Sequence, residues 1–425
     1  MRKLRLIAST VLMAAALVVS SCTPETVAQG VTDTTIKIGN AATVSGGFAV
    51  VGIPFNAGIK TRLMEANAAP IDGRTIEFVT YDDGGLASQG AQMTEKLVED
   101  DKIFALVGHF GTWTVGQTLP YIRDKGIPMV YAATGINSLF FESSPGNPIF
   151  AVQPIYRTEG RIMVARVFKE ADLFGTVAKL GVIYTTEDAG YSMLVGIEEQ
   201  AATMNKTSAL VKQGVVAGGD YSAAVIAMKD AGVDAVIVAT NQVYFQGIVT
   251  AMAANALIKP VVTSYVSAAA TYIPAAAVNQ GIDIYTNAWV DILSEAGAAD
   301  FATFTESINA AITAEKISAL EGAYALNPAL VAFAIAGYVA ADVFVTGLER
   351  LAADDKVVNW ENYIDALESA PVEFPLGGPI DFTNGKRHGL DSLSLLHAEY
   401  VAGETPTVNL VLAKPLETLP QIMAK

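Results

Sequence analysis

Short apolar runs alternate along the chain with segments of helical periodicity. Four runs without strict apolar and polar alternation come first: IKIGNAATVS from residue 36, TIEFVTYDD, IFALVGHF and IPMVYAATG. Such runs are typical of strands in a parallel sheet that is covered on both faces. The segments between them predict helices near 56–67, 88–99 and 115–125. This order predicts a doubly wound α/β unit.

The same pattern begins again near residue 179. The runs KLGVIYTTED, TSALVKQGVVAGG and DAVIVATN precede predicted helices near 192–204, 223–231 and 245–255, and PVVTSYV and GIDIYTNAW follow. Alanine-rich helices are expected from about 301 to 353, and strand and turn signals return after 371. At 425 residues the chain is too long for one typical core. We therefore expect two Rossmann-like lobes with a cleft between the carboxyl ends of their strands.

One apolar stretch, near residues 328–348, has the length and composition of a membrane span. It contains Asp342 and two glycines and precedes an ordinary charged segment. We interpret it as a buried core helix rather than a span.

The N-terminus has the composition of a secretory signal peptide over residues 1–21. Arg2, Lys3 and Arg5 precede the apolar stretch LIASTVLMAAALVV, which is too short to span a bilayer comfortably. Cys22 is the only cysteine, so it cannot form an internal disulfide. The tetrad VSSC resembles the lipobox of bacterial lipoproteins, which implies that Cys22 carries a lipid anchor. Residues 22–34 are expected to form a polar tether.

The charge and the inventory of reactive side chains argue against several functions. With 27 basic and 43 acidic residues the net charge is −16, which disfavours nucleic acid and anionic membrane surfaces as partners. There are three histidines and no Walker loop or GxSxG elbow, so we expect no catalytic residues, no metal and no cofactor. For metals this inventory argues against a zinc site of histidine and cysteine, whereas carboxylates could still hold calcium or magnesium. His109 is interpreted as a hydrogen-bonded structural residue, and Asp82 and Asp83 as a solvated loop that caps the next helix.

The stretch LVGHFGTWTVGQTLPYI carries the clearest signal for a ligand. A predicted strand ends there in Gly108, Gly111 and Thr112, directly before a predicted helix. Unpaired N–H groups and the positive end of the helix dipole make such a turn a good place to hold an anion.

The order of several segments resembles the type I periplasmic binding proteins, in the branch that binds leucine, isoleucine and valine. The segments are IKIGNAATVSGGFAVVGIPFNAGIK, TIEFVTYDDGG, GHFGT, GIPMVYAATG, VIYTTEDAGYS, DAVIVAT and GPIDFTNGKRHG. The resemblance implies two lobes joined by three crossings near Gln153, Thr286 and Pro375. It divides the chain into an N-terminal lobe of 35–153 plus 286–375 and a C-terminal lobe of 154–285 plus 376–425.

The resemblance also implies binding without chemistry. It predicts an extracytoplasmic solute-binding protein of an ABC importer, lipid-anchored in the periplasm or on the outer face of the cytoplasmic membrane. A small carboxylate-bearing molecule would bind between the lobes, and a membrane permease would recognise the closed form of what we expect to be a monomer. Branched-chain amino acids are the family default, and aromatic or aliphatic acids and amides are credible substitutes. A ligand sensor on the same fold is the alternative, and an enzyme is a third, less favoured class.

In the first lobe the resemblance aligns the family's carboxylate site with two loops. Thr112 falls on the hydroxyl position after one strand, and Ala132 and Thr134 fall on the backbone and hydroxyl positions after the next. Helix capping requires the same residue types and is the alternative for both threonines. Trp113 and Phe48 are expected to wall the apolar part of the ligand, or else to pack in the core.

In the second lobe the sequence departs from the family pattern. A family tyrosine falls on Ala189, or on Tyr191 if the register slips by two residues, and an aromatic position falls near Asn241. Tyr265 stands where amino-acid binders carry a carboxylate for the ligand's ammonium. Because a buried ammonium without a countercharge is costly, this departure leaves the identity of the ligand open.

Overall fold

The computed structural model describes residues 26–425, so the predicted signal peptide and Cys22 lie outside the described residues. Part of the expected tether does lie within them, and it is fastened to the protein. The Ala28 N–H donates to the carbonyl of Val358 at 3.1 Å. The Gln29 amide donates to the carbonyls of Val98 and Ile103 at 3.2 and 2.9 Å. Residues 28 and 29 are therefore held against the first lobe.

The first sheet is parallel throughout, with the strand order β2-β1-β3-β4-β5. Its strands are β1 (Thr35–Ala42), β2 (Thr75–Asp82), β3 (Ala105–Val107), β4 (Met129–Val130) and β5 (Ile149–Phe150). The helices around it are α1 (Ala49–Ala68), α2 (Ala87–Glu95), α3 (Thr112–Lys125), α12 (Val331–Ala353) and α13 (Trp360–Glu368).

Apolar side chains cover both faces of this sheet, which explains the continuous apolar runs. Ala105 and Val107 of β3 belong to the core shared with α1 and α12. Leu106 belongs to a separate core with residues of α3 and of the segment after α2. Successive strand residues point to opposite faces, so a strand buried on both sides shows no polar alternation.

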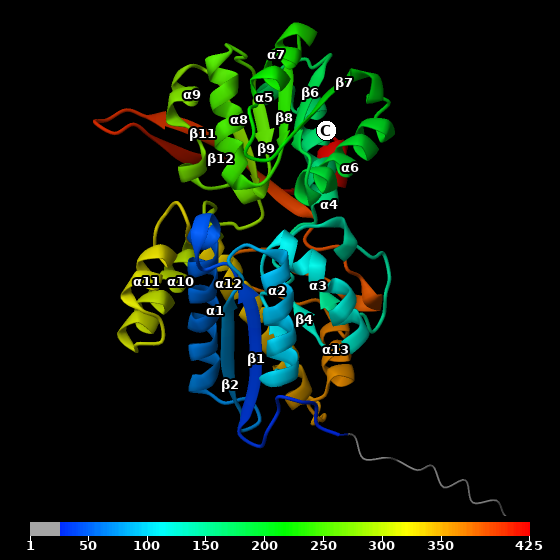
Figure 1. Ribbon diagram of the computed structural model, residues 1–425, viewed down its shortest axis with the longest axis vertical. Helices are drawn as coiled ribbons and strands as arrows, with labels where there is room; N and C mark the ends of the chain where they lie inside the picture. The colour runs from blue at the N-terminus through cyan, green and yellow to red at the C-terminus, as the bar shows by residue number, and fades with distance from the viewer. Residues whose placement is uncertain (1–25) are drawn as a thin grey trace, which may run out of the picture.

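The second sheet has seven strands in the order β12-β11-β10-β9-β8-β6-β7. Five of them are parallel, and β11 and β12 add an antiparallel hairpin that projects from the lobe (Figure 1). The strands are β6 (Leu180–Thr185), β7 (Leu210–Val215), β8 (Ala235–Ala239), β9 (Val261–Thr263), β10 (Ile284–Ala288), β11 (Ser392–Val401) and β12 (Thr407–Thr418). The helices are α4 (Tyr156–Lys169), α5 (Ala171–Phe174), α6 (Asp188–Thr203), α7 (Ser222–Ala231), α8 (Gln242–Ala254), α9 (Ala275–Asn279) and α14 (Leu419–Met423). The expected α/β class with two doubly wound sheets is confirmed.

The chain passes between the two lobes several times (Figure 1). It leaves the first sheet after β5 and enters the second lobe at α4, and it returns after β10 through α10 (Glu295–Thr313) and α11 (Ala319–Ala325) to α12. Arg387 is buried and donates to the carbonyls of Asn147 and Ile149, beside β5. Because this contact holds the segment before β11 against the first sheet, we propose a third crossing near residue 391 instead of near Pro375.

Helix α12 is the one helix among the described residues with the length and hydropathy of a membrane span, and 72% of its most apolar window is buried. It packs tightly on α1. A Cβ at Gly58 would lie 1.9 Å from the Ala334 carbonyl oxygen, and one at Gly337 would lie 1.8 Å from that of Phe55. Arg62 and Asp342 form an ion pair of 2.6 Å across the same contact. The interpretation of this segment as a core helix is confirmed.

Candidate ligand-binding site

A cavity lies between the two lobes, beside the start of α3. Its volume is about 80 Å³, against the roughly 10 to 15 Å³ that one water molecule requires. It therefore has room for a small molecule. Within the described part of the chain, no residue that lines it carries a charge. Nine of its lining residues are aromatic: Phe48, Phe55, Phe110, Trp113, Tyr131, Tyr156, Tyr265, Trp289 and Phe333.

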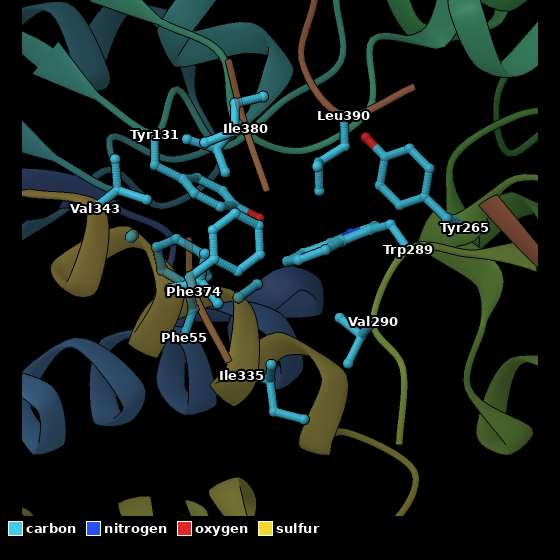
Figure 2. Packing of buried hydrophobic residues seen from close by; sticks show 14 of the residues in the cluster. Phe55, Tyr131, Tyr265, Trp289, Val290, Ile335, Val343, Phe374, Ile380 and Leu390 are labelled. Carbon is cyan, nitrogen blue, oxygen red and sulfur yellow. The ribbon is translucent and has the colours of Figure 1, made fainter. Parts of the chain in front are cut away.

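The aromatic rings of the wall pack against one another rather than singly. The ring centroids of Phe48 and Trp113 are 4.6 Å apart, and those of Tyr131 and Trp289 are 6.4 Å apart. Figure 2 shows the ring of Tyr131 extending toward Trp289. Such packing holds flat, polarisable surfaces around the cavity, which suits an aromatic or compact apolar group.

Thr112 and Thr134 lie together, as the two-loop carboxylate site requires. Their hydroxyl oxygens are 2.8 Å apart, Thr112 lines the cavity, and both residues are buried. The helix-capping alternative is wrong for Thr112, because the N-cap of α3 is Gly111, with φ 92°, and it receives no side-chain cap. Thr134 precedes the N-cap of the next short helix by two residues. Contact of these hydroxyls with a ligand stays a prediction.

Tyr156, at the start of α4, joins this pair from the second lobe. Burial raises the pKa of its phenol well above the usual range, and the hydroxyls of Thr112 and Thr134 act in the opposite direction. A neutral phenol therefore stands beside the two threonines. Sequence reasoning missed Tyr156, although its position directly after the first crossing was a usable signal.

The other expected first-lobe residues are divided between the cavity and the core. Phe48 and Trp113 line the cavity, as a ligand wall requires. Ala132 is fully buried behind the lining, and its neighbour Ala133 takes the place at the surface of the cavity.

Tyr191 is not brought to the cavity. It lies on α6 with 48% of its surface exposed, packs on Tyr184 with ring centroids 5.9 Å apart, and lines a separate hollow with Asn137 and Asp188. The alternative register, Ala189, is fully buried, and its backbone N–H donates to Glu187 at 3.0 Å. Neither Ala189 nor Tyr191 therefore places a tyrosine side chain in the cavity wall.

Tyr265 and Asn241 face the cavity from the second lobe. The Tyr265 hydroxyl accepts a hydrogen bond from the Gln153 amide at 2.8 Å and donates one to the Pro154 carbonyl at 2.9 Å. The ring, rather than the hydroxyl, is therefore what Tyr265 offers to a ligand. Asn241 precedes α8 without capping it through its side chain.

The acids near the cavity are engaged elsewhere. Glu159 is fully buried behind Tyr265 and accepts hydrogen bonds from the Tyr265 N–H, the Ser264 hydroxyl and the Asn287 amide at 2.7, 2.7 and 3.2 Å. Burial raises its pKa to about 7 against the lowering effect of these donors. Glu187 accepts from the first N–H groups of α6. Neither residue lines the cavity.

His109 has the structural role that its position suggested. It is fully buried, its Nδ1 accepts from the Ala41 N–H at 3.3 Å, and its Nε2 lies 3.2 Å from the hydroxyls of Thr94 and Thr118. Burial lowers the pKa of its imidazole to about 3, so the ring is neutral. It does not line the cavity.

Comparisons with known proteins identify the class of protein that this chain and its fold resemble. The sequence model of the periplasmic binding protein family matches residues 35–399. No curated protein sequence matches the chain. A fatty acid ABC transporter substrate-binding protein from Thermomonospora curvata has a similar structure, with a TM-score of 0.72 and 19% identity over 92% of this chain and 95% of that one.

Two further solved structures share the fold. One is a branched chain amino acid ABC transporter from Thermus thermophilus with bound valine, with a TM-score of 0.72 and 16% identity over 93% of this chain and 99% of that one. The other is a solute-binding protein of an ABC transporter from R. palustris in complex with 4-hydroxybenzoate. Its TM-score is 0.70, with 16% identity over 91% of this chain and 98% of that one. These are folds of solute-binding proteins and not of enzymes.

Proposed function

This chain belongs to the periplasmic binding protein family, and we propose that it is the extracytoplasmic solute-binding component of an ABC importer. We propose that it binds a small carboxylate-bearing molecule in the cavity between its lobes, and that the ligand carries no free ammonium group. Its partner would be an ABC permease in the cytoplasmic membrane, which recognises the closed protein. A ligand-sensing receptor on the same fold is the alternative, and no contact among the described residues favours it.

The observation that carries this proposal is the contrast between one side of the cavity and the rest of its lining. On one side of the cavity lies Thr112, the first residue of α3, with its hydroxyl 2.8 Å from that of Thr134. Helix N–H groups, the dipole and hydroxyl donors together favour a carboxylate there. Elsewhere the lining is aromatic and, among the described residues, uncharged.

The lack of a lining acid argues against an α-amino acid as the ligand. A buried ammonium needs a countercharge. Without one, the desolvation of the ion costs on the order of several kcal/mol. Glu159 already accepts hydrogen bonds from three donors, and it does not line the cavity. Aromatic acids, aliphatic acids and amides avoid this cost. Similar proteins hold either valine or 4-hydroxybenzoate, so this fold accommodates both kinds of ligand.

We propose the cellular location from the sequence. Residues 1–21 would direct export, and Cys22 would carry the lipid that anchors a monomer in the periplasm or at the outer face of the cytoplasmic membrane. Both features lie outside the described residues.

Mass spectrometry of the ligand carried through purification tests the proposal, followed by thermal-shift screening of acids, amides and amino acids. A ligand at a hundredfold excess over its dissociation constant stabilises the fold by about 2.7 kcal/mol. We expect such stabilisation from at least one carboxylic acid without an amino group. Stabilisation by α-amino acids alone would contradict the proposed ligand class, and turnover of the bound compound would contradict binding without chemistry.

A further inference from the structure

Two residues that line the cavity each carry a buried polar atom that lacks a hydrogen-bond partner among the described residues. The two atoms are the indole Nε1 of Trp113 and the hydroxyl of Tyr131. The Tyr131 side chain as a whole is fully buried. A buried polar group without a partner costs about 1 to 3 kcal/mol, so such groups are rare in native proteins.

The hydroxyls of the other two tyrosines that line the cavity are engaged. The Tyr265 hydroxyl bridges Gln153 and Pro154, and that of Tyr156 stands beside the threonine pair. Tyr131 is therefore the one tyrosine of the described cavity lining whose hydroxyl is left for another molecule.

The backbone of Tyr131 supplies a second observation. Its φ is 57°, in the left-handed region, which is unusual for a bulky side chain. It follows β4 directly, and its ring packs on Phe55 and Trp289 at centroid distances of 5.8 and 6.4 Å. Hydrogen bonds from Ala132 N to Phe150 O and from Ala133 N to His109 O hold the next two residues in place. Backbone strain of this kind costs about 1 to 3 kcal/mol, and residues that carry it are enriched at ligand-binding sites.

The chemistry of the two unpartnered groups defines what they require. An indole N–H donates and does not accept, so the group that meets Trp113 is an acceptor. Burial raises the pKa of the Tyr131 phenol well above its usual range, so it keeps its proton and donates as well. Among the described residues the cavity lining holds no cation, which makes a second carboxylate on the ligand costly.

We propose that Tyr131 is a specificity-determining residue whose hydroxyl donates a hydrogen bond to a neutral oxygen on the ligand. The preferred ligand is then a small acid with a hydroxyl, alkoxy or oxo substituent in addition to its carboxylate. This inference rests on the proposed function, because it assigns the second polar group of a ligand bound in the same cavity.

Matched pairs of ligands and the variant Tyr131→Phe test the assignment by calorimetry. The pairs are benzoate against the three hydroxybenzoates, and 4-methylpentanoate against 4-methyl-2-oxopentanoate. The wild type is expected to bind at least one substituted acid more tightly than its plain partner. Tyr131→Phe is expected to weaken binding of that substituted acid about tenfold and to leave the affinity for the plain acid unchanged. An equal loss of affinity for both members of a pair, or no loss of affinity for either, would overturn the assignment.

A measurement without ligand separates this inference from the proposed function. Tyr363 is also fully buried, but its hydroxyl donates to the Phe344 carbonyl at 3.1 Å, so Tyr363→Phe removes a structural hydrogen bond. We expect Tyr363→Phe to lower the melting temperature of the ligand-free protein and Tyr131→Phe to leave it unchanged or raise it. An equal fall in both variants would make the Tyr131 hydroxyl structural and overturn the inference. If no acid of any kind binds the wild type, the proposed function fails, whatever the two melting temperatures are.

Discussion

The hydroxyl oxygens of Thr112, which lines the cavity, and Thr134 lie 2.8 Å apart, although the two residues are 22 positions apart along the chain. One hydroxyl donates to the other, so one of the two hydrogens remains for a ligand or for the Tyr156 hydroxyl beside them. The pair lies at the start of α3 because β3 and β4 are neighbouring parallel strands whose carboxyl ends meet at one edge of the sheet.

We predict that Thr112→Val and Thr134→Val each weaken binding of a carboxylic acid by roughly ten- to a hundredfold. The reason is that a hydrogen bond to a charged group contributes about 1.5 to 3 kcal/mol. Calorimetry with the acid found by screening measures the change. Thr118→Val is the matched control, because Thr118 lies on the same helix but bonds to the Thr114 carbonyl at 2.8 Å, away from the cavity. Wild-type affinity in both test variants would mean that the two threonine hydroxyls do not contact the ligand.

We predict that Gln242→Glu shifts the ligand preference toward amino acids. Gln242 lines the cavity, and the substitution keeps the shape of the side chain while adding the countercharge that an ammonium needs. Tyr265→Glu is the less suitable variant, because its new carboxylate would stand beside buried Glu159, to which the Tyr265 N–H donates at 2.7 Å.

The ratio of the affinities for leucine and 4-methylpentanoate measures this shift, since the two differ only in the amino group. The ratio is expected to rise in Gln242→Glu and to stay constant in Gln246→Glu. Gln246 lies one turn further along α8, is exposed and does not line the cavity. An identical ratio in both variants would mean that position 242 does not meet the ligand.

We predict a pH dependence of stability that comes from Glu159. Its pKa rises from the ordinary 4.5 to about 7 on folding, so the folded protein binds this proton more tightly than the unfolded chain does. The corresponding stability is fully present below about pH 4.5 and is lost as the pH rises through 7. A shift of this size amounts to on the order of 3 kcal/mol.

Urea unfolding of the wild type and of Glu159→Gln at pH 5 and pH 8 measures this contribution. The wild type is expected to lose more unfolding free energy between these pH values than the variant does. Comparing the two proteins cancels the other titrating groups. Equal losses would mean that Glu159 is ionised in the folded protein at both pH values.

We predict that Cys22→Ala releases the protein from the membrane, because the only cysteine follows the predicted signal peptide directly. Cell fractionation with a labelled fatty acid measures both location and modification. Unlabelled wild-type protein, together with unchanged membrane association of the variant, would rule out the anchor.

The sequence predicted the fold better than the site. Continuous apolar runs such as the one around Leu106 mark strands covered on both faces, and the structure has them as β strands of two parallel-rich sheets. The pairing of Thr112 and Thr134 was accessible because both follow strands that end at the same edge. The late position that we propose for the third crossing was not accessible, because it rests on the contacts of Arg387 with Asn147 and Ile149.

Side-chain direction accounts for most of what the sequence did not reveal. Asp83 was interpreted as part of a solvated loop, but it is fully buried and accepts hydrogen bonds from the hydroxyls of Thr43 and Thr114, both at 2.5 Å. Tyr131 lies in the loop that was assigned to the ligand, yet a sequence pattern does not show a left-handed φ or an unpartnered hydroxyl. Both features depend on packing between segments far apart in the chain.

The central claim is that the cavity holds a carboxylate without a neighbouring ammonium, and calorimetric competition tests it most directly. The competitors are leucine, isoleucine and valine, set against their des-amino and 2-oxo analogues and against benzoate. We predict that at least one acid without an amino group binds as tightly as the best of the three amino acids, or more tightly. Sub-micromolar binding of leucine, isoleucine or valine, with no binding of the analogues, would contradict the claim and require a carboxylate partner for the ammonium that the cavity lining does not contain.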